Sequence, residues 1–332
     1  VYKRQVMKKF LTFMFIALVV PAFLLSGCKK DEEENKYEIL VDYLKSQNLD
    51  VNTMHAPVDG QGWAVSATAL NDNIGDYYII DIRSAADFNA GHIEGAVNTT
   101  LANVLTEAAK AGNKKIMIVC YSGQVAAYAL AACRLSGYPN TFFLKWGMSA
   151  WNSSKDVWTA KIGNIGNGHA NWVPFTESPL SFAANVDAGK VPVVKSASDE
   201  GATILKERVA AVLAEGAKFV QPAEALNNPE NYFIINYWSV ENVQANGNAH
   251  IKGAHRILPL TLAANEVKFL DPDEKIATYC WTGQTSSAVT FYLRVIGFNA
   301  YGIQWGCNGI VNDALTSNKW PQEQQDFPIV VP

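Results

Sequence analysis

The chain has 332 residues, of which 49% are hydrophobic and 17% charged, and its formal net charge at pH 7 is −4. This length and composition indicate a folded protein with room for two domains, and they exclude a disordered chain. The acidic balance implies no basic surface, so we expect no nucleic-acid partner.

The N-terminal part has the features of an export signal. A Met-Lys-Lys sequence (7–9) precedes an apolar run (10–25), which ends in Leu-Ser-Gly-Cys (25–28). The run is short for a transmembrane helix and is broken by Pro21, and it resembles a bacterial lipoprotein signal peptide with its lipobox. We therefore expect cleavage before Cys28 and lipidation of its thiol, giving a membrane anchor. The predicted location is the bacterial cell envelope, lipid-anchored at the outer membrane on its periplasmic or surface face.

This assignment divides the first 36 residues into two parts. Residues 1–27 would be the signal peptide, and residues 1–6 are expected to be extraneous, because a transposase sequencing adapter would encode Val-Tyr-Lys-Arg-Gln. Residues 28–36, with a Lys-Lys pair and then an acidic run, would be a solvated tether.

The rest of the chain contains a long tandem repeat. Val-Cys-Tyr-Ser-Gly-Gln (119–124) corresponds to Tyr-Cys-Trp-Thr-Gly-Gln (279–284), and other segments align at offsets between 155 and 160 residues. These are 77–83 with 232–238, 91–96 with 249–254, and 145–147 with 304–306. We therefore predict two copies of one domain, at 37–152 and 196–332. The linker (153–195) contains Trp158, Trp172 and Phe175, so we expect it to pack against the domains rather than to be flexible.

The hydrophobic pattern predicts the same elements in both copies. In chain order they are a helix (37–46), strands (77–82 and 115–119), a helix (124–135) and a strand (141–144), then a helix (203–214), strands (232–236 and 275–279), a helix (285–296) and a strand (300–303). Continuous apolar strands alternating with helices predict an α/β fold in which each domain has a mostly parallel sheet flanked by helices. Active sites in such sheets form beyond the carboxyl ends of the strands, where both repeated cysteines are expected.

Each repeated cysteine precedes small residues and the predicted start of a helix. Backbone N–H groups in such a loop, together with the positive end of the helix, favour a thiolate. Cys120 and Cys280 are therefore the candidate catalytic nucleophiles.

These motifs together resemble the rhodanese family, twice, over most of the chain after Cys28. They are Asp-Ile-Arg (81–83), the Gly-His-Ile segment (91–98), the cysteine loop and Trp-Gly-x-x-x-Trp (146–151). The resemblance implies that the cysteine takes up a sulfane sulfur, carries it as a persulfide and passes it to a thiophilic acceptor. The persulfide cradle would be Tyr121, Ser122, Gly123, Gln124 and Val125 in the first copy, and Trp281, Thr282, Gly283, Gln284 and Thr285 in the second.

We expect a membrane-anchored sulfurtransferase, similar to a thiosulfate sulfurtransferase, which uses a small sulfur donor and a thiol or cyanide acceptor. No cofactor is expected, and no metal, because neither a C-x-x-C pair nor histidines at ligand spacing occur in the sequence. The alternative is a non-enzymatic persulfide or thiol carrier, or a rhodanese module that binds a partner such as a redox protein.

Some residues depart from the family pattern. Neither loop contains the Arg or Lys that would hold an anionic donor, which makes thiosulfate less certain as the substrate. The lack of Arg also argues against the phosphatases that share this fold, because these need it to bind phosphate. Asp81 and Arg83 are expected to form a structural ion pair, which Asn236 and Trp238 replace in the second copy.

Four further residues are interpreted individually. His92 and His250 are expected to brace a turn rather than to act as bases. Cys133 is expected to pack in the core, well away from Cys120. We predict Cys307 as a resolving thiol for Cys280, giving the second copy a redox function that the first, with Met148, lacks.

Overall fold

The computed structural model describes residues 34–176 and 182–331. The predicted signal peptide, the lipidation site Cys28 and most of the tether lie outside the described residues. The described residues from 35 onward belong to one compact unit. Within the described ranges, none of the helices combines the length and the apolar character that a membrane span requires.

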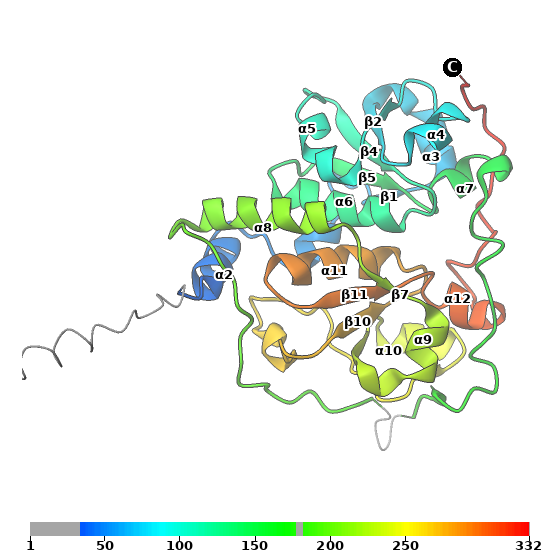
Figure 1. The fold of residues 1–332 in the computed structure, drawn as a ribbon. Helices are drawn as coiled ribbons and strands as arrows, with labels where there is room; N and C mark the ends of the chain where they lie inside the picture. The colour runs from blue at the N-terminus through cyan, green and yellow to red at the C-terminus, as the bar shows by residue number, and fades with distance from the viewer. Residues whose placement is uncertain (1–33, 177–181, 332) are drawn as a thin grey trace, which may run out of the picture. The chain divides into compact units, whose positions relative to one another are not determined.

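Domain 1 contains a five-stranded parallel sheet (Figure 1). Its strands, in the spatial order β1-β5-β4-β2-β3, are Ala64–Val65, Thr141–Leu144, Lys115–Val119, Tyr77–Asp81 and Val97–Asn98. Its helices are α3 (Ala67–Asp72), α4 (Ala85–Asn89), α5 (Val104–Ala108), α6 (Gln124–Leu135) and α7 (Met148–Trp151). The strands are apolar throughout because both faces are covered: Ile116 and Ile118 belong to one core cluster, and Met117 and Val119 to another.

Domain 2 repeats this arrangement with a four-stranded parallel sheet. Its strands, in the spatial order β7-β11-β10-β8, are Phe219–Val220, Ala300–Ile303, Ile276–Tyr279 and Phe233–Asn236. Its helices are α8 (Gly201–Glu215), α9 (Pro222–Asn227), α10 (Val240–Ala245), α11 (Gln284–Val295) and α12 (Asn308–Val311), and α2 (Tyr37–Ser46) packs against α8. The predicted fold class is confirmed, and each predicted helix and strand is present with ends within two residues of the prediction.

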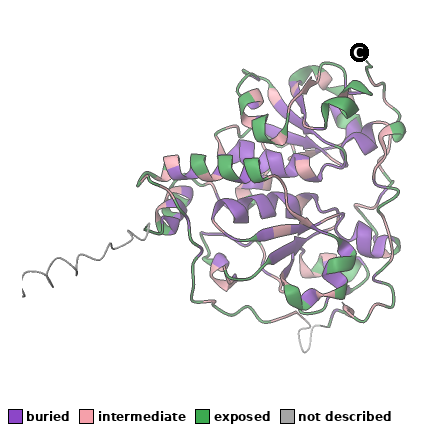
Figure 2. Cartoon of the chain, viewed as in Figure 1, coloured by how far each residue is buried: buried purple, intermediate pink, exposed green. Residues whose placement is uncertain are grey.

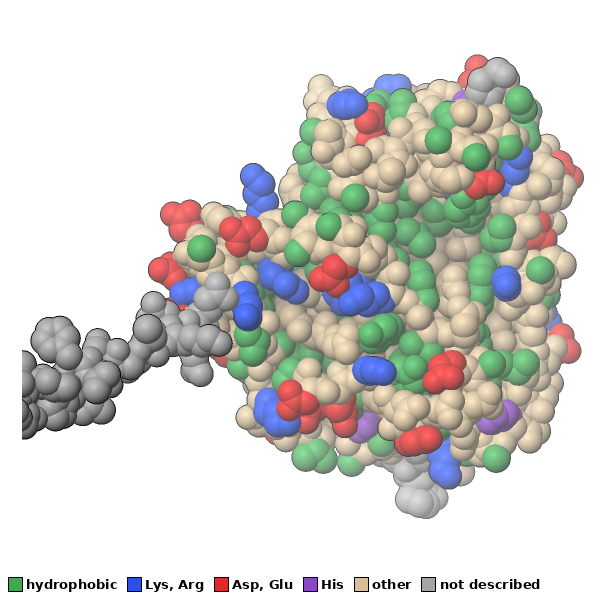
Figure 3. All heavy atoms as spheres, in the orientation of Figure 1, with side chains coloured by type: hydrophobic (Ala, Val, Ile, Leu, Met, Phe, Trp, Pro, Cys, Tyr) green, Lys and Arg blue, Asp and Glu red, His purple; other side chains and the backbone are tan. Residues whose placement is uncertain are grey.

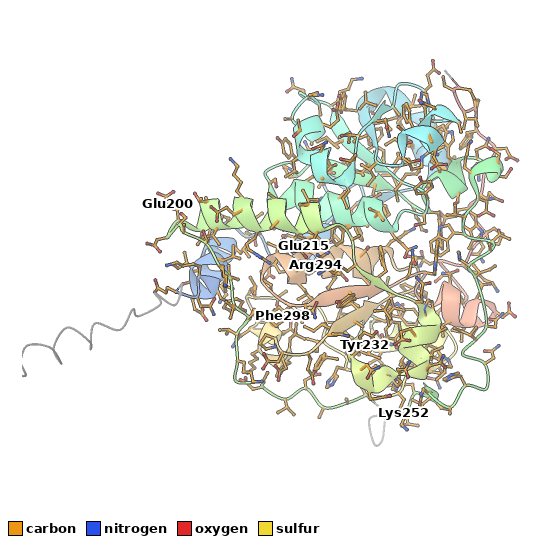
Figure 4. All side chains as sticks on the ribbon, viewed as in Figure 1. Glu200, Glu215, Tyr232, Lys252, Arg294 and Phe298 are labelled. Atoms are coloured by element: carbon orange, nitrogen blue, oxygen red, sulfur yellow. The ribbon has the colours of Figure 1, made fainter. Side chains whose placement is uncertain are left out.

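Helices α6 and α11 pack against each other between the two sheets (Figure 1). Both are almost entirely buried (Figure 2), including polar residues such as Gln124 in α6 and Arg294 in α11. The Tyr128 ring meets Phe291 edge-on, with centroids 4.7 Å apart. Arg294 in α11 pairs with Glu215 at 2.7 Å (Figure 4), and its guanidinium also donates to the Tyr128 hydroxyl. The domains therefore share one continuous core cluster.

The linker packs along both domains, as predicted. Trp158 contacts Trp146 of domain 1 and Trp305 of domain 2, with ring centroids 4.8 and 4.9 Å apart. Further on, β6 (Trp172–Pro174) pairs antiparallel with β9 (Ala249–Ile251). These contacts hold the first described stretch of the linker (153–176) against the domains.

Charged side chains on the face in Figure 3 are interspersed by sign. Lys190 pairs with Asp271 and Asp273, and Lys145 pairs with Glu323 at 2.5 Å. Exposed pairs of this kind contribute little to stability, so the fold depends mainly on its buried clusters.

Candidate active site

The Cys120 loop lies at the carboxyl end of β4, as the sequence predicts. The thiol sulfur faces the N–H groups of Gly123 at 3.2 Å and Ala126 at 3.3 Å. Gly123 has φ +81°, a conformation that lets the loop turn tightly into α6. Ala126 is the third residue of α6, so its N–H is one of the groups that a helix start leaves free. Ala126 was not among the residues predicted for the cradle. Its position in the first turn of the predicted helix could have identified it.

Burial opposes the effect of these N–H groups on the thiol. Cys120 is only 2% exposed. Burial raises the pKa of the Cys120 thiol above its usual value, and the N–H groups of Ser122, Ala126 and Gly123 lower that pKa without reversing the shift. The predicted effect of the N–H groups is therefore present, and burial opposes it in this closed loop.

A Trp-Gly turn (146–147) after β5 packs against the backbone of the Cys120 loop. Met148 N–H donates to the Cys120 carbonyl at 2.8 Å, and Ser149 N–H donates to the Tyr121 carbonyl at 3.3 Å. A Cβ atom on Gly147 would lie 2.4 Å from the Cys120 oxygen. The turn can approach the loop this closely only with glycine at that position.

Tyr121 lies at the mouth of the loop and is 37% exposed. Its hydroxyl donates to the Asp87 carboxylate and accepts from Ser84 N–H at 3.2 Å. The Arg83 guanidinium lies 5.8 Å from the centroid of the Tyr121 ring. Asp87 was not predicted from the sequence, because it has no motif of its own and reaches the loop only through the fold.

Arg83 is engaged by other partners at this mouth. It forms a buried ion pair with Asp81 at 2.7 Å and donates to the Gly91 carbonyl at 2.9 Å. These contacts tie the end of β2 to the turn before β3, which is the arrangement expected of a structural pair.

The two predicted bracing histidines contact rings and backbone. His92 stacks on Phe88 with ring centroids 3.8 Å apart and contacts the Phe88 carbonyl through Nδ1. His250 stacks on Phe182 at 4.1 Å, and its Nδ1 lies 2.8 Å from the Ile251 carbonyl. These contacts fit the predicted bracing role.

The Cys280 loop has the same architecture with different contacts. Cys280 is 3% exposed, and its sulfur lies 3.4 Å from Ser286 N–H and 3.6 Å from the Ser286 hydroxyl. Ser286 occupies the place of Ala126 and was likewise absent from the predicted cradle. Among the predicted residues, Thr282 accepts from Gln284 N–H at 3.2 Å.

Aromatic side chains lie beside the Cys280 loop. The rings of Trp238 and Trp281 lie 5.0 Å apart, where domain 1 has Arg83 and Tyr121. Their indole N–H groups are buried without a hydrogen-bond partner. In the place of Asp81, Asn236 donates to the Tyr279 hydroxyl at 2.7 Å. The two sites therefore differ in chemistry as well as in sequence.

The four described cysteines are free and buried. Cys133 lies within α6 in the shared core, as predicted. Cys307 N–H donates to the Cys280 carbonyl at 3.0 Å, so the backbones of the two residues are in direct contact. Cys280 and Cys307 pack in the same buried cluster, and the Cys280 thiol contacts the Ser286 hydroxyl. The resolving role of Cys307 stays a prediction.

Residues 34–176 and 182–331 contain no group of three or more acidic, His or Cys side chains arranged to hold a metal ion.

Comparison with known proteins gives a consistent family. The model of the Rhodanese-like domain matches residues 66–154 and 227–313, which together make up more than half of the chain. The thiosulfate sulfurtransferase GlpE of Shewanella oneidensis is 32% identical over 77 residues, covering 23% of this chain and 76% of that protein. The uncharacterized protein YibN of Escherichia coli is 31% identical over 80 residues, covering 23% of this chain and 56% of its own length.

Two solved structures match both domains at low identity. The thiosulfate sulfurtransferase of Pseudomonas aeruginosa is 11% identical, covers 90% of this chain and 49% of its own, and has a TM-score of 0.29. The 3-mercaptopyruvate sulfurtransferase SseA of Escherichia coli is 16% identical, covers 74% of this chain and 99% of its own, and has a TM-score of 0.28.

Proposed function

Because the chain belongs to the rhodanese-like domain family, we propose that it is a sulfurtransferase that carries sulfane sulfur as a persulfide on Cys120. The observation that carries this proposal is the pair of N–H groups of Gly123 and Ala126, at 3.2 and 3.3 Å from the Cys120 sulfur. They stabilise negative charge on sulfur, which both the attacking thiolate and the resulting perthiolate bear. The GlpE relative, a thiosulfate sulfurtransferase, supports the same reaction class.

The reaction proceeds in two displacements. The Cys120 thiolate attacks the sulfane sulfur of the donor, and the donor's sulfur bond breaks with its electron pair leaving on the departing group. A thiol or cyanide acceptor then attacks the outer sulfur of the persulfide, which returns the thiolate. Since the thiol is buried, we expect the loop to open before a donor reaches it. Tyr121, which is held by Asp87 and Ser84, is one side chain whose release would accompany this opening.

The donor is expected to carry little negative charge. The nearest cation at the mouth of domain 1, Arg83, is already neutralised by Asp81. The mouth of domain 2 is lined by Trp238 and Trp281. An organic persulfide, whose reacting group carries at most one negative charge, fits these surroundings better than the thiosulfate dianion does.

A thiosulfate:cyanide assay and a parallel assay with a persulfide donor test this function. We expect Cys120→Ser to remove most of the turnover, and mass spectrometry to find one added sulfur atom on Cys120 of the wild type. Cys133→Ser is the matched control, because it changes a buried thiol in α6 that faces the core. Equal turnover by the wild type and the Cys120→Ser, Cys280→Ser double variant would refute the enzymatic proposal.

A second candidate function is a non-enzymatic persulfide or thiol carrier. The burial of both loop thiols favours it, because closed loops protect a bound sulfur and slow its release. The added sulfur atom without turnover would support this candidate.

We also propose that a lipid on Cys28 anchors the protein in the bacterial cell envelope. The support comes from the sequence, in which the apolar run ends in Leu-Ser-Gly-Cys. Labelled palmitate fed to expressing cells is expected to be incorporated into the wild type and not into Cys28→Ala. Equal incorporation into both, or into neither, contradicts the anchor.

A further inference from the structure

The two cysteine loops exchange glutamine side chains across the domain interface. Gln284, the first residue of α11 in domain 2, donates from Nε2 to the Ser122 carbonyl in the Cys120 loop at 3.0 Å. Gln124, the first residue of α6 in domain 1, accepts through Oε1 from Trp305 N–H at 2.9 Å. Both glutamines are buried, so these hydrogen bonds are shielded from water.

Close packing at the interface leaves each of the two glutamine side chains a single position. A Cβ atom on Gly123 would lie 2.6 Å from Gln284 Nε2, and a Cβ atom on Gly283 would lie 2.6 Å from Gln124 Oε1. Each loop glycine therefore provides the space that the glutamine of the other domain occupies.

A chain of hydrogen bonds connects the two thiol loops through this exchange. Gln124 Nε2 donates to the Ser122 hydroxyl at 3.2 Å while its Oε1 holds Trp305. Two residues beyond Trp305, the N–H of Cys307 donates to the Cys280 carbonyl at 3.0 Å. A displacement of the Cys120 loop is thereby passed to the turn that supports Cys280.

We propose that Gln124 and Gln284 are positioning residues that couple the two sites, so that the chemical state of one loop thiol changes the reactivity of the other. An atom added to Cys120 must displace the tightly packed loop around it, and the exchanged glutamines carry that displacement across the interface. The coupling acts in both directions, because linkage between two sites is reciprocal.

The two glutamines are not equivalent. Ser122 O has a second donor, Trp158 Nε1 at 3.2 Å, and keeps it when Gln284 is replaced. Trp305 N–H loses its acceptor when Gln124 is replaced, and a buried unpaired donor is the costlier defect. Gln124→Met is therefore expected to disturb the Cys280 site more than Gln284→Met disturbs the Cys120 site.

The test measures alkylation of single loop thiols by iodoacetamide as a function of pH, with peptide mass spectrometry identifying the cysteine. In the Cys120→Ser chain, Gln124→Met is expected to change the Cys280 rate about fivefold and to shift its pH midpoint. In the Cys280→Ser chain, Gln284→Met is expected to change the Cys120 rate by a smaller factor in the same assay.

Tyr128→Phe is the matched control. It removes a buried hydrogen bond from the same α6–α11 interface, between the Tyr128 hydroxyl and Arg294, away from both loops. It is expected to leave both alkylation rates within about twofold of the parent chain. Equal rates in Gln124→Met and Tyr128→Phe, including the case in which neither chain reacts, would overturn the coupling.

A second measurement needs no glutamine substitution. In the wild type, alkylation of Cys120 is expected to change the subsequent Cys280 rate, and an unchanged rate would also overturn the proposal. Alkylation requires reactive thiols and not sulfur transfer, so this result is independent of the assay for the proposed function.

Discussion

Gly147 and Gly306 occupy equivalent positions under the two cysteine loops. Gly147 has φ +64° and Gly306 has φ +53°. A Cβ atom on Gly306 would lie 2.3 Å from the Cys280 oxygen, much as one on Gly147 would meet the Cys120 oxygen. The repeated Trp-Gly pair is therefore explained by backbone contact, which lets the turn after one strand support the loop after its neighbour.

Gly147→Ala is expected to destabilise domain 1 by about 3 kcal/mol, because the methyl group adds a backbone clash to the strain of positive φ. Gly137→Ala is the matched control: Gly137 also has positive φ, at +88°, but nothing lies within 4 Å of its Cβ position. That change is expected to cost only about 1 kcal/mol. Urea unfolding measures both free energies, and equal losses would show that the contact with Cys120 is unimportant.

At the scale of elements, the long strands and helices could be predicted because each is a continuous apolar segment. The two-residue strands β1 and β3 could not, because they form by pairing with β5 and β2 and have no period of their own. The short helices α7 and α12 follow the Trp-Gly turns and depend on contacts with the cysteine loops. The local hydrophobic pattern therefore predicts the long strands and helices, and tertiary contacts determine the short elements.

The same division applies to the candidate site. The loop cysteines were predictable, because the carboxyl ends of parallel strands are a general place for function. The contacts of Ala126 and Ser286 depend on where each helix begins relative to its loop. The raised pKa of Cys120 comes from burial of the thiol, and the exchange of glutamines comes from packing between the domains. Local spacing in a single sequence encodes neither.

At the scale of the whole molecule, each domain is completed by a segment of the other half. Asp50, just after α2, accepts from Leu262 and Ala263 N–H in domain 2, each at 3.0 Å. The segment after α12 runs back along domain 1 (Figure 1), where Phe327 N–H donates to the Trp151 carbonyl at 3.0 Å. These crossings, with the shared core between α6 and α11, explain why residues 35–332 form one unit.

Phe327→Ala tests whether the returning segment stabilises domain 1. The Phe327 ring packs on Trp151, with centroids 5.1 Å apart, and the Phe327 carbonyl accepts from the Asn152 amide at 2.8 Å. Truncation of this half-buried ring is expected to lower the free energy of unfolding by about 2 kcal/mol. Val331→Ala is the control in the same segment, since Val331 is exposed and is expected to change stability by less than about 0.5 kcal/mol.

Because the domains share a core, urea unfolding of Phe327→Ala should shift as one transition seen by fluorescence and circular dichroism alike. Two separate transitions would contradict this expectation. They would mean that domain 2 stays folded after its C-terminal segment has lost its contacts with domain 1.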